Sequence, residues 1–211
     1  MTNTPAMNRY SWYGKLPSAG DFLQRRFPDT LQRQWSHWFQ VGLLAWQQEE
    51  QRSGERQFHK APVWNFVVPP MLGSQMIQMG CLLPGRDSVG RQYPVCLQLS
   101  FAPSEWSTSL LSQAESWYQQ IGRLGLHAVR NSFSASQLDE MLMSIPAPQP
   151  VEPQKRSDIL DVIGYDEDGQ STLGWPQAAE CFDPLRQTSY WWTNRCDGYP
   201  LYTHVHSGNF T

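Results

Sequence analysis

Apolar residues recur at helical spacing over residues 30–50, which predicts the first long helix of the chain. Asp29 is expected to cap this helix, and Gln32 completes a capping-box pattern three residues later. The apolar stripe consists of Leu31, Trp35, Trp38, Phe39, Gly42, Ala45 and Trp46. Core packing is the favoured interpretation of this stripe, and an exposed aromatic docking face is the alternative.

Strand-like runs precede and follow this helix, at residues 9–14, 62–68, 76–83 and 93–101. The last three runs follow one another through connections that are too short for a crossover helix. We therefore expect them to form an antiparallel meander. Two further strands are predicted at residues 189–193 and 199–205, around an Arg-Cys-Asp-Gly turn.

A second helix is predicted to begin at residues 103–104 and to continue for five turns, with Gly122 and Gly125 weakening its end. Its apolar face consists of Trp106, Leu110, Ala114, Trp117, Ile121 and Leu124. A third, short helix is predicted from Ser136, with Asp139 at the capping-box position. Its inward side chains are expected to be Leu138, Met141, Leu142 and Ile145.

This order of elements predicts an α/β fold, a layered sandwich in which helices cover a largely antiparallel or mixed sheet. A chain of 211 residues fits one large domain, so residues 1–211 are expected to form a single domain. The proline-rich stretch at 146–157 is interpreted as an exposed surface loop rather than a domain linker. The content of 40% hydrophobic and 17% charged residues is typical of a globular protein.

The charge and cysteine content exclude several classes of function. The net charge is −3, and the 13 Arg and three Lys residues are spread along the chain, so nucleic-acid binding is not expected. No secretory signal and no run of roughly 18–20 apolar residues is present, so we expect no membrane insertion. The cysteines are widely spaced and are interpreted as reduced thiols of a cytoplasmic protein without a zinc site: Cys81, Cys96, Cys181 and Cys196.

The loop at residues 84–91 is the strongest local candidate for a functional site. Arg86, Asp87 and Arg91 are crowded onto a turn between two apolar strands. In one interpretation Asp87 caps the turn and pairs with one of the arginines; in the other the loop is a functional surface. Asp21 presents a similar choice between a hydrogen-bond acceptor for loop amides and a catalytic carboxylate.

No motif in the sequence identifies an enzyme. His204 and His206 are at i and i+2 on a predicted strand and point to one face, but no third metal ligand is evident nearby. The nucleophile motif Gly-x-Ser-x-Gly, the phosphate-binding P-loop and the dinucleotide fingerprint are all absent. We therefore expect no catalytic residue, no metal and no cofactor.

Four segments resemble the TagF (ImpM) family of type VI secretion accessory proteins, in the family's order. The first two are Gly-Lys-Leu-Pro-Ser-Ala-Gly-Asp-Phe at 14–22 and Ala-Pro-Val-Trp-Asn-Phe at 61–66. The third, at 83–94, is similar to the family's Pro-Ser-x-Asp-x-Val-Gly-Arg-x-Phe-Pro segment, although Gly85 replaces Ser and Tyr93 replaces Phe. The fourth is Ser-Tyr-Trp-Trp-Thr at 189–193.

The resemblance implies an α/β sandwich and a regulatory function. TagF-like proteins are cytoplasmic negative regulators that act after translation, alongside a threonine-phosphorylation pathway. They are thought to bind the pathway's forkhead-associated scaffold protein. One alternative is a structural subunit of the secretion apparatus. Another is a small metal-dependent hydrolase that uses Asp21, Asp87, His204 and His206.

The expected mechanism is occlusion of a partner by a preformed face built from the loops at 14–22 and 85–91. Arginine and aromatic side chains are the usual anchors of such faces. The candidate partner-binding residues are Lys15, Asp21, Phe22, Arg25, Arg26, Arg86, Asp87 and Arg91.

Overall fold

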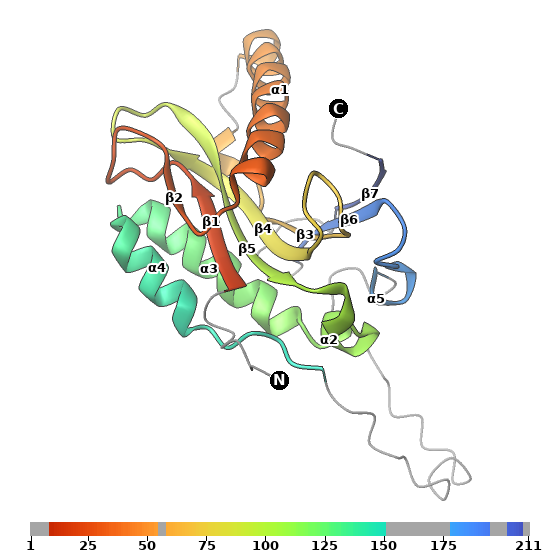
Figure 1. The fold of residues 1–211 in the computed structure, drawn as a ribbon. Coiled ribbons are helices and arrows are strands. Elements are labelled where there is room, and N and C mark those ends of the chain that lie inside the picture. The colour runs from red at the N-terminus through yellow and green to blue at the C-terminus, as the bar shows by residue number, and fades with distance from the viewer. Residues whose placement is uncertain (1–8, 55–57, 151–177, 195–201, 209–211) are drawn as a thin grey trace, which may run out of the picture.

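The computed structural model describes residues 9–54, 58–150, 178–194 and 202–208, and their core is an antiparallel sheet between helices (Figure 1). The strand order is β2-β1-β5-β4-β3-β6-β7, and every neighbouring pair is antiparallel. The strands are β1 (Tyr10–Gly14), β2 (Leu23–Arg25), β3 (Trp64–Val68), β4 (Ile77–Arg86), β5 (Gln92–Phe101), β6 (Thr188–Thr193) and β7 (Thr203–Ser207). The predicted α/β sandwich and its meander, β3-β4-β5, are confirmed.

Helices lie on both faces of this sheet. Helix α1 (Asp29–Ser53) is on one side, and α3 (Glu115–Arg130) and α4 (Ala135–Ser144) are on the other (Figure 1). Alternation along the strands explains the two cores, because successive side chains point to opposite faces. Phe66 and Val68 pack with α1, whereas Val67 between them packs with α3. The short helices α2 (Thr108–Ser112) and α5 (Ala178–Cys181) lie at one end of the α3 layer.

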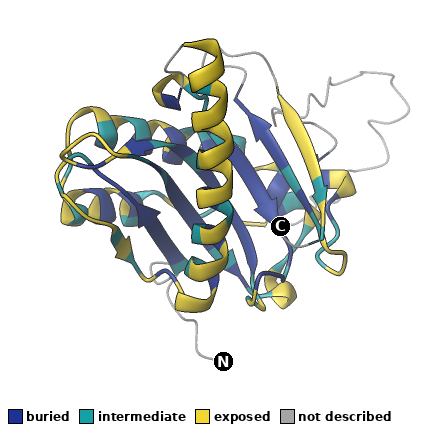
Figure 2. Ribbon diagram, turned by 90° about the horizontal axis from the view of Figure 1, so that it is seen from above, coloured by how far each residue is buried: buried dark blue, intermediate teal, exposed yellow. Residues whose placement is uncertain are grey.

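The N-terminal half of α1 is packed on the sheet, and its C-terminal half extends over an apolar groove. Leu31, Trp35 and Phe39 are buried, so core packing is the correct interpretation there. Gly42, Ala45 and Trp46, which belong to the same predicted stripe, are exposed. Figure 2 shows the outward side of this long helix mostly as exposed. This half borders a groove of about 260 Å³, whose lining includes Trp38, Gly42, Leu43, Trp46, Phe58 and Trp64.

The start of α1 also differs from the prediction. Asp29 is the first helical residue, and Pro28 occupies the N-cap position without a side-chain cap. The Asp29 carboxylate is therefore in the first turn, where the positive end of the helix dipole favours an anion.

The predicted second helix is broken into a 3-10 turn (Pro103–Glu105), α2 and α3. Ser107 and Ser109 hydrogen-bond each other, and the Ser112 hydroxyl donates to the Ser109 carbonyl. Serine side chains that bond locally compete with continuous helix. The predicted weakening at Gly122 and Gly125 is wrong, since α3 continues to Arg130.

Those two glycines allow α3 to approach the sheet closely. A Cβ at position 122 would be 3.2 Å from Val63 Cγ1, and one at position 125 would collide with Leu83. Because glycine has no Cβ, the helix can pack closer to the sheet at these positions, although glycine lowers the helix propensity slightly.

Helix α4 begins one residue earlier than predicted and has a different cap. Ser134 and Gln137 form the capping box, in place of Ser136 and Asp139. Leu138 and Leu142 are buried as expected, but Met141 is exposed. Of the predicted proline-rich loop, residues 146–150 form no helix or strand, and 151–157 lie outside the described residues.

Trp35 is the centre of the α1-side core. Its side chain is fully buried and its ring contacts those of Trp38, Phe39, Phe66 and Trp191. We expect Trp35→Ala to lower the free energy of unfolding by about 3–5 kcal/mol, because it leaves a large cavity. The matched control Val41→Ala, at an exposed position of the same helix, should change it by less than about 0.5 kcal/mol. Urea denaturation followed by tryptophan fluorescence measures both; equal effects would contradict this account of the core.

Candidate functional site

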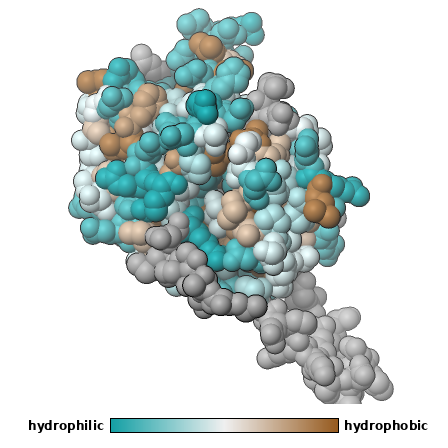
Figure 3. All heavy atoms as spheres, viewed as in Figure 1, coloured by the Kyte–Doolittle hydropathy of each residue, from teal (hydrophilic) through white to brown (hydrophobic). Residues whose placement is uncertain are grey.

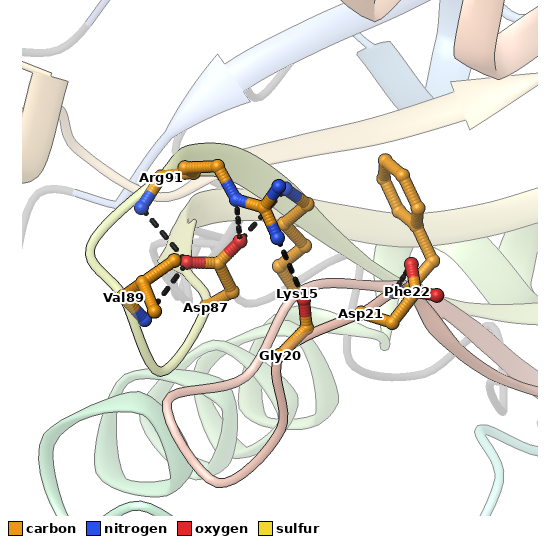
Figure 4. Close-up of polar contacts among 7 residues, drawn as sticks. All are labelled: Lys15, Gly20, Asp21, Phe22, Asp87, Val89 and Arg91. Carbon is orange, nitrogen blue, oxygen red and sulfur yellow. Dashed lines mark hydrogen bonds and ion pairs between the residues drawn. The ribbon is translucent and has the colours of Figure 1, made fainter.

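The two predicted loops meet at one end of the sheet. The loop after β1 and the β4–β5 hairpin emerge side by side because β1 pairs with β5. The Ser88 amide donates to the Ala19 carbonyl at 2.9 Å, and Arg91 Nη2 donates to the Gly20 carbonyl at 2.7 Å (Figure 4). We call the surface formed by residues 14–22 and 85–91 the loop face.

Asp87 joins the two loops through a buried carboxylate. Its Oδ2 accepts from Lys15 Nζ at 2.9 Å and from Arg91 Nε at 2.7 Å. Its Oδ1 accepts from the backbone amides of Val89 at 3.1 Å and Arg91 at 2.9 Å (Figure 4). The Asp87 side chain has no exposed surface. Asp87 therefore caps the turn and pairs with Arg91, as the first interpretation of this loop predicted, and the same contacts fix the shape of the surface.

These contacts keep Asp87 ionised. Desolvation raises the pKa of the carboxyl, but the hydrogen bonds from Lys15, from Arg91 and from the Val89 amide outweigh it. The pKa of Asp87 is therefore well below its ordinary value. This group of Lys15, Asp87 and Arg91 carries two cations for one anion, so it contributes net positive charge to the loop face.

Phe22 and Asp21 form the outer part of the first loop. The Phe22 ring is 44% exposed; it stacks on Tyr13 and meets Tyr93 edge-on, with centroids 5.7 Å and 4.7 Å away. Lys15 Nζ is 4.8 Å from the centre of the same ring, a cation–π distance. Asp21 is exposed and accepts a hydrogen bond from the Phe22 amide, as turn aspartates do.

Gly85 and Arg86 have different roles in the hairpin. A Cβ at position 85 would be 2.7 Å from the Lys15 carbonyl oxygen, so glycine lets the two loops touch. Arg86 is the last residue of β4 and is exposed. Its guanidinium has no ion pair within the described residues.

Arg25 and Arg26 are not part of the loop face. Arg26 forms a bidentate pair with Asp139 of α4 and donates from Nε to the Tyr10 carbonyl. Arg25 is opposite Trp12 in the β1–β2 pairing, and its charge contributes to the low pKa of Asp139. Both cations therefore act on Asp139 of α4, and Arg26 ties the end of β2 to the helix layer.

The structure therefore divides the eight predicted residues into three groups. Asp21, Phe22, Arg86 and Arg91 are exposed on the loop face. Lys15 and Asp87 are buried beneath it and hold it together. Arg25 and Arg26 lie elsewhere. Sequence reasoning missed Val89, which is 73% exposed at the hairpin tip, although an apolar residue in a Gly-flanked turn was a usable signal.

The residues of the alternative metal-dependent hydrolase are not assembled. His204 and His206 are neighbours on β7, with ring centroids 6.3 Å apart. Strand β7 is at the edge of the sheet opposite to β1 and β2. Among the described residues, no group of three or more His, Cys, Asp and Glu side chains could hold a metal ion.

The cysteines and the possibility of a membrane-spanning helix can be checked in the described part of the chain. Cys81, Cys96 and Cys181 are free thiols, and burial raises the pKa of the first two. Cys196 lies outside the described residues. None of the described helices is both long and apolar enough to cross a bilayer. The face seen in Figure 3 is largely hydrophilic, with apolar residues scattered over it.

The fold and the site together define a class of protein: an α/β sandwich with two charged loops locked together at one end of its sheet. The family model described as TagF N-terminal domain, type VI secretion system-associated, matches residues 11–145. The chain belongs to this family, as its motifs predicted, and is thereby associated with type VI secretion.

A solved structure has the same fold. The crystal structure of PA0076 from Pseudomonas aeruginosa PAO1, at 2.05 Å resolution, is similar with a TM-score of 0.69 and 21% sequence identity. The similarity covers 94% of this chain and 88% of that chain. No curated protein matches the sequence.

Replacing Asp87 tests the buried ion pair. We expect Asp87→Asn to lower the Tm at neutral pH, because Lys15 and Arg91 lose their counter-charge. The pKa of Asp87 is lower in the folded than in the unfolded chain, where it is about 3.9. The ionised carboxylate therefore stabilises the fold above that pH, and this contribution is lost as pH falls through the folded pKa.

The Tm difference between wild type and Asp87→Asn should be constant between about pH 7 and about pH 5 and should shrink below about pH 4. Asp21→Asn is the matched control, since it removes the same charge from an exposed position of the same face. A control that loses as much stability as Asp87→Asn, or a difference that grows with acid, would refute the assignment. Differential scanning fluorimetry across pH measures both variants.

Proposed function

We propose that this protein is a non-enzymatic, cytoplasmic repressor of type VI secretion that acts after translation by binding a forkhead-associated scaffold protein. Membership of the TagF family supports the pathway. The loop face supports a binding function because Asp87 fixes two loops in one arrangement before any partner arrives. A preformed surface loses less conformational entropy on association than mobile loops do.

The repressor acts by occlusion in this proposal. Arg86, Arg91 and Phe22 provide exposed cationic and aromatic groups on the loop face, which are the groups enriched at the centres of interfaces. Val89 adds an apolar contact at the tip of the hairpin. A scaffold protein held on this face would be kept out of the assembling secretion machine.

Arg86 is the position that tests the loop face most directly. Charge reversal of Arg91 would also disturb Asp87, its buried partner, whereas Arg86 has no described ion pair to lose. We expect Arg86→Glu to weaken binding of the scaffold protein by about 2 kcal/mol or more, which is roughly thirtyfold in Kd. Isothermal titration calorimetry with the purified scaffold protein measures this, and circular dichroism should be unchanged.

Arg33→Glu is the matched control, since it reverses one exposed charge on α1, a helix that does not belong to the loop face. Equal affinity of wild type and Arg86→Glu would remove Arg86 from the interface. A pull-down that recovers sheath or baseplate components, and no scaffold protein, would favour the alternative of an assembly subunit.

A further inference from the structure

A second concave surface adjoins the same hairpin, on the side of α3 and of residues 58–63. The pocket has a volume of about 770 Å³. Its walls come from the ends of β4 and β5, from the C-terminal half of α3 and from the short helix Phe58–Lys60. A volume of this size exceeds that of a single small anion and falls within the range of ligand pockets, about 300–1,000 Å³.

Among the described residues, the charged groups around this pocket are all basic. Arg86, Arg123 and Arg130 line it together with His59, and no Asp or Glu of the described segments does. The guanidinium groups of Arg86 and Arg130 have no ion pair within the described residues. The carboxylate nearest in sequence to Arg86 is Asp87, whose two oxygens are already bound by Lys15, Arg91 and backbone amides. The positive charge of the pocket is therefore not neutralised by that residue.

The basic groups surround an apolar strip. Arg123, Leu126 and Arg130 are at i, i+3 and i+7 along α3, a spacing that places them on one helical face. Val129 and Val63 add further apolar lining. The pocket thus combines cations from two separate elements with an aliphatic surface between them.

We propose that this pocket binds an acidic segment of a partner protein. Aspartate or glutamate carboxylates of the segment would pair with Arg86 and Arg130, whose planar guanidinium groups suit bidentate contacts. An adjacent apolar side chain of the segment would pack on Leu126 and Val129. The concave shape and the few cations fit a short peptide better than nucleic acid, which needs an extended basic stripe.

This inference goes beyond the proposed function. It rests on the proposed function only for the identity of the protein that carries the acidic segment. The charge complementarity is a property of the pocket alone. The net charge of the whole chain is −3, so attraction of an acidic peptide would reflect this local cluster and not a general basic surface.

Fluorescence anisotropy with the full-length protein tests the inference. The probe is a fluorescein-labelled synthetic peptide of Asp, Glu and Leu residues, and the control probe replaces each acid with Asn or Gln. We expect wild type to bind the acidic probe at least about tenfold more tightly than the amide probe, with affinity falling as salt rises. Equal affinity for the two probes would overturn the inference.

The protein variant is the double substitution Arg123→Glu and Arg130→Glu, with Arg33→Glu as the matched control. The double variant should lose the preference for the acidic probe, and the control should keep it. If charge reversal unfolds the protein, Arg123→Gln and Arg130→Gln remove the same charges with a good helix former. Retained preference in a folded double variant would refute the site.

Scaffold binding by the same proteins separates this inference from the proposed function. Normal scaffold binding by wild type, with no preference for the acidic probe, would overturn only the basic pocket. Preference for the acidic probe without scaffold binding would overturn only the proposed function. Loss of both interactions in the double variant would support the pocket and identify the scaffold protein as the source of the segment.

Discussion

Asp87 is a charged side chain without contact with water, and a carboxylate persists in such a place only when ion pairs and hydrogen bonds replace its hydration. Lys15 supplies one of these from the loop after β1, and Arg91 and two backbone amides supply the others from the β4–β5 hairpin. Because β1 pairs with β5, the two loops leave the sheet at the same end. Burial of one charge therefore fixes the relative position of both loops, and with it the loop face.

Within the candidate site, only contacts between residues close together in the sequence could be predicted. The pairing of Asp87 with an arginine of its own turn was foreseen, because Arg91 is four residues away. Lys15 is 72 residues away, and nothing in the sequence shows which cation will reach the carboxylate. Arg26 was predicted to lie on the loop face, but it pairs instead with Asp139, which is 113 residues away in the sequence. Charged residues reveal a potential for ion pairs, but tertiary contacts select the partner.

The central strands of the sheet could be predicted from the sequence, whereas strand β2 and the buried part of α1 could not. Runs of largely apolar residues marked the meander β3-β4-β5, because both faces of it are covered by helices and successive side chains are buried on either side. Strand β2 was missed because it has three residues, too few to show a period. The stripe of α1 was read correctly as apolar, yet periodicity reports only that a face is apolar. Which part of that face the sheet covers depends on where the helix crosses it.

Arg86 links the loop face to the basic pocket through the charge distribution of the β4–β5 hairpin. Asp87 engages Lys15 and Arg91, so it leaves the neighbouring Arg86 available. Arg86 belongs both to the loop face and to the lining of the basic pocket. A partner that covers the loop face would therefore share a cation with any acidic segment in the pocket. If one protein supplies both contacts they reinforce each other, whereas two separate proteins would compete for Arg86. The shared arginine thus makes the two surfaces energetically coupled, without requiring any change of conformation.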